Sequence, residues 1–263
     1  MEYRTTMIGF FIKKAFFDGW DHLYALAGFN GIALLFVLIF FVLPATLAAP
    51  LWIIIVAAAV AVLALSVWNI VVSAAMYKVA EDKPAHFREA WGALPRALKP
   101  GLLLGGINLL YGIAITVALP FYLAQKAMWG VFVGGLLFWT MLMGLLILQY
   151  VPAILARDSC TTLTALKTAL YLFVDNPGFS IFLLLWRTFT LAVSAATMFL
   201  APGLTGVALA SAVAVRLRMK KYGYLKAHPE THRRRIPWDE ILEEERERVG
   251  TRTLKGMIFP WKD

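Results

Sequence analysis

The stretch LWIIIVAAAVAVLALSVWNIVVSAAMY, residues 51–77, contains no charged side chain. A helix of about 20 apolar residues crosses the hydrocarbon core of a bilayer, and a charge at its centre costs about 2.5–3.5 kcal/mol on insertion scales. The stretch therefore predicts a membrane-spanning helix. Similar runs recur between Asp21 and Arg216, and Arg187 is the one charged residue inside any of them.

Six such runs predict an all-α, polytopic membrane helix bundle. They cover residues 23–43, 51–77, 101–123, 128–155, 179–199 and 203–215. The last run is short for a full crossing and is expected to tilt less or to sit where the bilayer is thin. We place the transmembrane domain at residues 22–218, after an N-terminal segment of residues 1–21 and before a tail of residues 219–263.

The composition agrees with this class of protein. Of the 263 residues 60% are apolar and 16% are charged, and the mean hydropathy is +0.72, whereas soluble domains are about 45–50% apolar and about 25% charged. The chain after residue 215 holds 13 Lys and Arg against 8 Asp and Glu. Beside a membrane this excess favours attraction to anionic lipids and argues against nucleic acid as the partner.

Lys and Arg are concentrated in alternate gaps between the runs, which predicts the orientation. Three precede the first run and 13 follow the last; five lie in residues 78–100 and two in 156–178, whereas residues 44–50 and 200–202 have none and 124–127 have one. Short loops rich in Lys and Arg stay in the cytoplasm. We therefore expect a bacterial inner-membrane protein with both termini in the cytoplasm and short external turns.

The N-terminal segment, residues 1–21, is predicted to be an amphipathic helix. Lys14, Asp18 and Asp21 share one helical face, and aromatic residues occupy much of the remainder. This pattern is typical of a helix that lies in the headgroup region of a membrane. A simple lead-in to the first span is the alternative.

Two cytoplasmic loops, residues 86–98 and 162–174, are also predicted to form amphipathic helices against the inner leaflet. Each is followed by a Pro-Gly pair, at Pro100 and Pro177, where the next span is expected to begin. Pro95 should kink the first of these helices. The likeness of the two loops suggests an internal repeat in parallel orientation, with chance similarity as the alternative.

The tail is predicted to contain a short helix that starts near Trp238 and ends at Gly250. Its early turns hold Glu243 to Glu245, which the helix dipole favours. The chain then closes on apolar residues that a solvated end would not concentrate: Leu254, Met257, Ile258, Phe259, Pro260 and Trp261. We expect this end to pack on the two cytoplasmic loops or on a partner protein.

Five polar residues lie at similar depth inside the spans: Asn30, Asn69, Asn108, Gln149 and Arg187. Each is seven to nine residues from the cytoplasmic end of its span, or about 10–14 Å at about 1.5 Å per residue. Buried amides and a guanidinium need partners in lipid. They predict either interhelical hydrogen bonds or a polar pocket for an anionic or hydroxyl-rich ligand, such as a lipid headgroup or a sugar.

No catalytic motif accompanies these residues. The chain has no His-Glu-x-x-His, Gly-x-Ser-x-Gly, phosphate loop, dinucleotide fingerprint or paired-cysteine metal motif, and Cys160 is its single cysteine. No catalytic residue, metal ligand or cofactor is therefore predicted. The spans also lack a carboxylate, which disfavours a proton-coupled carrier. Gly101 and Gly105, four residues apart, are predicted to allow two helices to approach closely.

The chain resembles, over about residues 8–222, the YesL family of bacterial six-helix membrane proteins. The resemblance is carried by Lys13-Lys14-Ala15-Phe16-Phe17 before a span with Asn30 and Pro44, by the loop around Phe87 with its following Pro100, and by Asn176-Pro177. It implies association with carbohydrate import systems and carries over no site residue.

The leading functional hypothesis is a non-enzymatic membrane subunit or accessory protein of a transport system. Membrane lipids and a transporter subunit are its expected partners. The alternative is a lipid- or solute-handling carrier that uses an inner-leaflet pocket around Arg187, and a membrane enzyme comes third.

Overall fold

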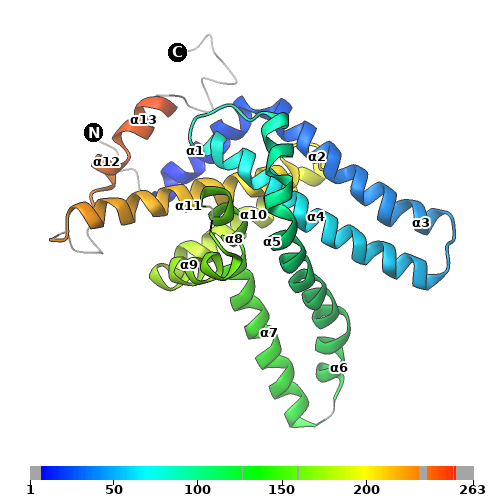
Figure 1. Cartoon of the computed structure of the whole chain (residues 1–263). Coiled ribbons are helices and arrows are strands. Elements are labelled where there is room, and N and C mark those ends of the chain that lie inside the picture. The colour runs from blue at the N-terminus through cyan, green and yellow to red at the C-terminus, as the bar shows by residue number, and fades with distance from the viewer. Residues whose placement is uncertain (1–6, 126, 159, 231–235, 251, 253–263) are drawn as a thin grey trace.

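The computed structural model describes residues 7–125, 127–158, 160–230, 236–250 and 252, and within these ranges all regular structure is helical (Figure 1). In chain order the elements are α1 (Met7–Asp21), α2 (Leu23–Val37), η1 (Leu38–Val42), α3 (Leu43–Thr46), α4 (Leu51–Ala80), α5 (Phe87–Ile113), η2 (Ala114–Ala118), α6 (Leu119–Ala124), α7 (Met128–Leu148), α8 (Val151–Arg157), α9 (Thr162–Asp175), α10 (Pro177–Ala196), α11 (Gly203–Ala227), α12 (Trp238–Ile241) and α13 (Glu243–Val249); η1 and η2 are π-helical turns.

Five helical segments within the described ranges are long and apolar enough to cross a membrane. They are Leu23–Thr46, Leu51–Ala80, Phe87–Ala124, Met128–Arg157 and Pro177–Ala196. The prediction of an all-helical, multi-pass membrane protein is confirmed at this level. The sixth predicted span, residues 203–215, opens helix α11 but does not join the five, because Arg216, Arg218 and Lys220 follow it directly in the same helix.

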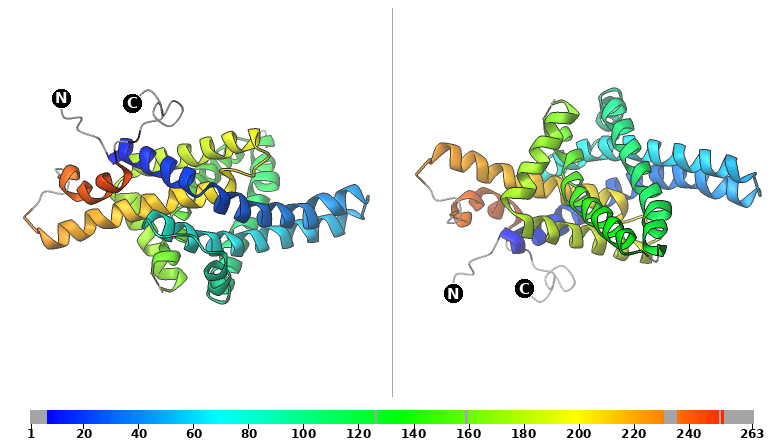
Figure 2. Two further views of the ribbon diagram at one scale, coloured as in Figure 1. Left: turned by 90° about the horizontal axis from the view of Figure 1, so that it is seen from above. Right: turned by 90° about the horizontal axis from the view of Figure 1, so that it is seen from below.

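Two long hairpins diverge from the centre of the molecule (Figure 1). The first runs from α2 to α4 and the second from α5 to α7, and Figure 2 shows the first reaching away from α12 and α13. The outgoing arm of each contains a π-helical turn, η1 or η2, just before a Leu-Pro pair at Pro44 or Pro120. Proline has no backbone N–H to donate, so the helix widens for one turn there.

The order of elements recurs three times along the chain. A helical segment precedes a helical hairpin in α1 with α2–α4, in the start of α5 with α5–α7, and in α9 with α10–α11. The two similar loops noted in the sequence are thus two of three corresponding positions. One difference separates them: α10 begins at Pro177 as predicted, whereas no helix begins at Pro100.

The predicted break at Pro100 is therefore wrong, and helix α5 continues through Pro95 and Pro100. Each proline removes one N–H from the helix, but α5 packs along α4 in the most extensive helix pair of the molecule. A Cβ added to Gly101 would lie 2.5 Å from the Cα of Val67, and one added to Gly105 would lie 2.8 Å from Leu63. The predicted close approach of helices at these glycines is confirmed.

Helix α11 lies at the centre of the bundle, against α1, α2, α4, α8 and α10. Every residue from Thr205 to Val215 is buried. This segment consists of Gly, Ala, Ser, Thr, Val and Leu, and such small side chains let neighbouring helices pack closely on all sides. The helix then continues to Ala227, across the predicted domain boundary between residues 218 and 219.

Helix α1 occupies the predicted segment, but its polar face points into the protein. Lys14 is fully buried and Asp18 nearly so, and Phe10, Phe11 and Phe17 are buried on the same side of the helix. The opposite side is apolar and partly exposed, with Ile8 at 40% and Trp20 at 49%. The location of this helix in the headgroup region stays a prediction.

The tail forms two short helices, α12 and α13, which end at Gly250 as predicted. Leu242, Glu245 and Val249 are buried in the contact with the rest of the protein. Lys13 of α1 donates a 2.8 Å hydrogen bond to the carbonyl of Gly250, so the seat of these helices is on α1 and α11. The closing apolar segment, residues 254–261, lies outside the described residues, as does the packing predicted for it.

Candidate functional site

Two adjoining cavities, each about 250 Å³, lie where the α4–α5 crossing meets α10 and α11. Five residues line both cavities: Ser66, Asn69, Asn108, Arg187 and Val207. We call the pair the Arg187 cavity. Its first lobe extends towards Trp68 and Thr205 and its second lobe towards Tyr111 and Gln149. The structure thus brings together Asn69, Asn108, Gln149 and Arg187 of the five polar residues predicted to share a site, and it leaves Asn30 out.

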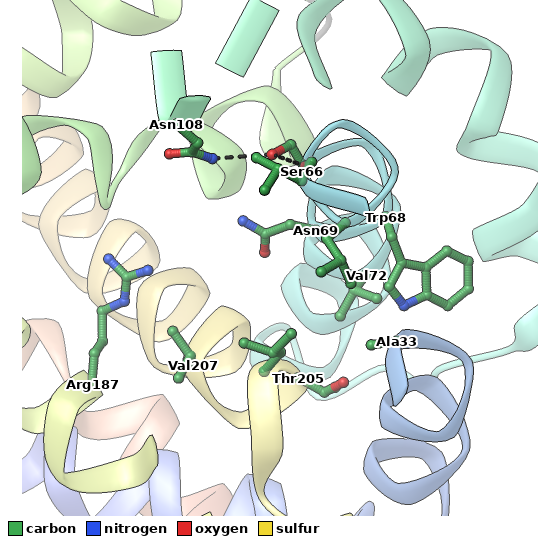
Figure 3. Close-up of a pocket in the computed structure, with 12 residues that line it drawn as sticks. Ala33, Ser66, Trp68, Asn69, Val72, Asn108, Arg187, Thr205 and Val207 are labelled. Atoms are coloured by element: carbon green, nitrogen blue, oxygen red, sulfur yellow. Dashed lines mark hydrogen bonds between the residues drawn. The ribbon is translucent and has the colours of Figure 1, made fainter. Parts of the chain in front are cut away.

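Arg187 is the one charged residue among the side chains that line the cavity. It projects from α10, and its Nε is buried without a hydrogen-bond partner. Within the described part of the chain the guanidinium forms no hydrogen bond or ion pair to another residue. An arginine has five N–H donors and normally satisfies them when it leaves water. This one turns its unused donors towards the cavity (Figure 3).

Asn69 faces Arg187 across this space, as Figure 3 shows. Among the described residues no hydrogen bond is formed by its side-chain amide, whereas its backbone carbonyl accepts from Ser73. Asn108, on α5, donates a hydrogen bond to the hydroxyl of Ser66 at 3.0 Å, and the Ser66 hydroxyl donates in turn to the carbonyl of Val62. One N–H of Asn108 is thus engaged within the protein, while its second N–H and its oxygen form no hydrogen bond among the described residues.

Gln149 is held at the break between α7 and α8. Its Nε2 donates to the carbonyls of Leu146 at 3.0 Å and Ser180 at 2.9 Å, and its buried Oε1 has no partner. The neighbouring Tyr150 shares a 2.9 Å hydrogen bond with the hydroxyl of Ser180. These contacts tie the second hairpin to α10, and they leave one amide oxygen of Gln149 at the edge of the second lobe.

Asn30 serves the packing of helices instead. Its Nδ2 donates to the carbonyls of Leu200 and Pro202, and its Oδ1 accepts from both the backbone N–H and the hydroxyl of Thr205. All of its hydrogen-bonding groups are engaged by the turn that opens α11. A Cβ on Gly203, whose φ is +58°, would collide with this amide at 2.3 Å, so the position requires glycine. Of the two predicted roles for polar residues in the spans, interhelical bonding holds for Asn30.

Four lining residues with hydroxyl groups were not identified from the sequence: Ser66, Tyr111, Thr188 and Thr205. Helical spacing could have found two of them, because Ser66 precedes Asn69 by three residues and Tyr111 follows Asn108 by three, which places each pair on one face. Tyr111 donates to the carbonyl of Met141 at 3.1 Å and so bridges α5 and α7. No sequence pattern assigns Thr205 to the cavity. Its position follows from its hydrogen bond to Asn30 in the structure.

The chemistry of this cavity is that of binding. Its lining contains no Asp, Glu, His, Lys or Cys side chain, so it offers no titratable base, and its one charge is positive. No cluster of His, Cys, Asp or Glu suited to a metal ion occurs within the described ranges. Fixed donors around a single cation are the arrangement that suits oxygens carrying negative charge.

A second concentration of charge lies outside the five spans, where α1, α11, α13 and the α4–α5 loop meet. We call it the charged cluster and define it by Lys14, Asp18, Asp82, Arg216 and Glu245. Lys14 Nζ lies 2.8 Å from Asp82 Oδ1, 3.1 Å from Asp18 Oδ2 and 3.4 Å from Glu245 Oε2. Arg216 pairs with Asp82 and Glu245. One lysine thus meets carboxylates from three separate segments.

Burial and charge act in opposite directions in this cluster. Burial raises the pKa of Asp18 to about 7, and the attraction of Lys14 only partly offsets it. Although burial opposes the shift, Lys14 and Arg216 hold the pKa of Asp82 below its ordinary value, and Lys220 with the same cations lowers the pKa of Glu245. Asp82 and Glu245 therefore remain charged at neutral pH, whereas Asp18 titrates there.

Comparison of the chain with family models, with curated proteins and with solved structures finds no match.

Proposed function

We propose that this chain is a membrane protein that binds an anionic or hydroxyl-rich ligand in the Arg187 cavity. The single observation that carries the proposal is the unpaired guanidinium of Arg187, which faces a cavity lined by otherwise uncharged residues. Leaving a buried charge without a partner costs several kcal/mol. A bound anion removes that cost, which is why an unpaired guanidinium beside a cavity supports ligand binding better than packing alone.

The finer topology belongs to the same proposal. The buried first half of α11 acts as the sixth membrane-embedded segment, and both termini lie in the cytoplasm of a bacterium, with the protein in the inner membrane. The distribution of Lys and Arg supports this orientation. The Arg187 cavity then lies in the inner-leaflet half of the bilayer, where a lipid headgroup or a cytoplasmic solute can reach it.

The test compares Arg187 variants purified from native membranes in mild detergent. We expect mass spectrometry to find an anionic compound with the wild-type protein and not with Arg187→Leu. Arg187→Lys should retain the charge but lose bidentate geometry, and so weaken binding by roughly tenfold to a hundredfold, the equivalent of one charged hydrogen bond. If Arg187→Leu retains the same compounds and unfolds at a higher temperature, Arg187 only packs, and the proposal fails.

The role as a subunit or accessory protein of a carbohydrate transporter rests on the resemblance to the YesL family and stays a prediction. It is compatible with ligand binding, because such a subunit can itself hold the solute. The same purification separates the two hypotheses. A second protein in constant ratio with the wild-type chain supports the accessory role, whereas a solitary protein with a bound anion supports a carrier.

A further inference from the structure

The charge of the lining residues restricts the class of ligand that the Arg187 cavity can bind. All lining residues other than Arg187 are uncharged, and no carboxylate or second cation lies among them. In a medium of low dielectric constant an excess charge of either sign is expensive. A ligand group with one negative charge therefore matches the cavity, whereas a neutral sugar leaves Arg187 unpaired and a dianion brings an uncompensated charge.

The second lobe is lined largely by apolar side chains. Leucines from three helices surround the polar end of this lobe: Leu104, Leu145, Leu148, Leu184 and Leu191. A small free anion would make no favourable hydrophobic contact with these leucine side chains. A hydrocarbon chain does, since each buried CH₂ group contributes about 0.8 kcal/mol.

The lobe also reaches the outside of the bundle between α7 and α10. These helices contact each other over only a short stretch. Leu145 on the rim of the lobe is 42% exposed, and Thr188 on the opposite rim is exposed as well. The surface beside this rim is apolar, with Met143 and Leu185 exposed. Both helices belong to segments that are long and apolar enough to cross the membrane, so the rim opens towards lipid.

One side of the first lobe is held by hydrogen bonds within the protein, although Leu204 in its lining is 44% exposed. Trp68 donates through its indole N–H to the carbonyl of Phe29 at 3.1 Å, and Asn30 fastens the start of α11 through Thr205. Between α7 and α10 the hydrogen bonds of the described residues are confined to one end, where Gln149 and Tyr150 contact Ser180. The gap between α7 and α10, where leucines line the second lobe, is a route along which the apolar part of a bound molecule can extend.

From these observations we infer that the ligand is a singly charged anionic amphiphile. Its headgroup lies between Arg187, Asn69 and Asn108, and its hydrocarbon chain leaves between α7 and α10 into the bilayer. A phospholipid with a phosphodiester and no compensating cation has this chemistry. The inference rests on the proposed function, because it names the class of ligand for the same cavity.

The experiment measures binding of three probes to the full chain in mild detergent, by the shift in thermal unfolding temperature. The probes are phosphatidylglycerol, phosphatidylcholine with the same acyl chains, and inorganic phosphate. We expect a saturable upward shift with phosphatidylglycerol alone, and its loss in Arg187→Gln. A matched pair of substitutions on α7 tests the route: Leu145→Trp fills the rim and should weaken phosphatidylglycerol binding at least fourfold, the value of about one CH₂ group. Met143→Trp, equally exposed but outside the cavity lining, should not.

The possible results separate this inference from the proposed function. If phosphate gives the same shift and competes with phosphatidylglycerol, the ligand is a free anion, so the inference fails while the proposed function stands. If Leu145→Trp and Met143→Trp bind phosphatidylglycerol equally well, the route between α7 and α10 is wrong. If phosphatidylcholine acts like phosphatidylglycerol in both the wild type and Arg187→Gln, the anion site itself is refuted and both proposals fall. If no probe shifts unfolding, the inference of an anionic amphiphile fails, and the proposed function is decided by the compounds that mass spectrometry finds with the wild type and Arg187→Leu.

Discussion

Replacing Lys14 with methionine should destabilise the protein far more than the same change at Lys13. The two lysines are neighbours in α1. Among the described residues Lys13 makes one side-chain hydrogen bond, to the carbonyl of Gly250, whereas Lys14 is fully buried among Asp18, Asp82 and Glu245. Methionine keeps the length and the helix propensity of the side chain. The pair of variants therefore isolates the buried charge.

The magnitude follows from what each carboxylate keeps after Lys14 is removed. Asp82 keeps Arg216 and Arg248, and Glu245 keeps Arg216 and Lys220. Among the described residues Asp18 has no other cation within reach. Removing one partner of a buried pair costs about 3–5 kcal/mol. The raised pKa of Asp18 lets it take up a proton and limits the penalty, so we expect the lower end, about 3 kcal/mol.

Thermal unfolding in mild detergent, followed by far-ultraviolet circular dichroism, measures this difference. For a chain of this size about 1 kcal/mol corresponds to about 2–4 °C, so Lys14→Met should unfold about 6–12 °C below the wild type. Lys13→Met loses one hydrogen bond and should fall by no more than about 4 °C. Adding Asp18→Asn to Lys14→Met should restore part of the loss, because the amide needs no counterion. Equal unfolding temperatures for the two single variants would refute the assignment of Lys14 as the centre of the cluster.

Three further results are expected. Gly101→Ala should cost about 1–3 kcal/mol, because the new Cβ would force α4 and α5 apart; Gly106→Ala, where nothing lies within 4 Å, should be neutral or stabilising, and similar losses at the two positions would contradict the helix crossing. The folded protein holds a proton on Asp18, whose pKa is about 7, that the unfolded chain releases near pH 4. Its contribution to stability should therefore decrease as pH rises from about 4 to about 7, by up to about 1.4 kcal/mol per unit, and a stability profile that Asp18→Asn leaves unchanged would argue against this titration. Finally, a cysteine at Ala48 should react with an impermeant thiol reagent in intact cells while Cys160 does not; labelling of Cys160 from outside would reverse the proposed orientation.

The membrane-spanning segments could be found from the sequence because the property that defines them is local. Hydrophobicity and length are properties of consecutive residues, so residues 51–77 predict a membrane-spanning helix independently of the helices that pack against them. Arg187 could be singled out for the same reason, as the one charge inside an apolar run. The glycines at 101 and 105 predicted a close helix contact, although not that α4 would be the partner.

Only the tertiary structure decided what each polar side chain does. Asn30 and Asn69 are alike in type and depth, yet Asn30 is fully engaged by the start of α11 and Asn69 is left facing a cavity. The environment of Lys14 was likewise decided by the tertiary structure. The helical pattern placed Lys14 on a polar face, but its burial follows from ion pairs with Asp82 and Glu245, which lie in distant segments of the chain. Burial and hydrogen bonding depend on which helices pack against one another. That packing is determined by contacts between residues far apart in the chain, which a local sequence pattern does not contain.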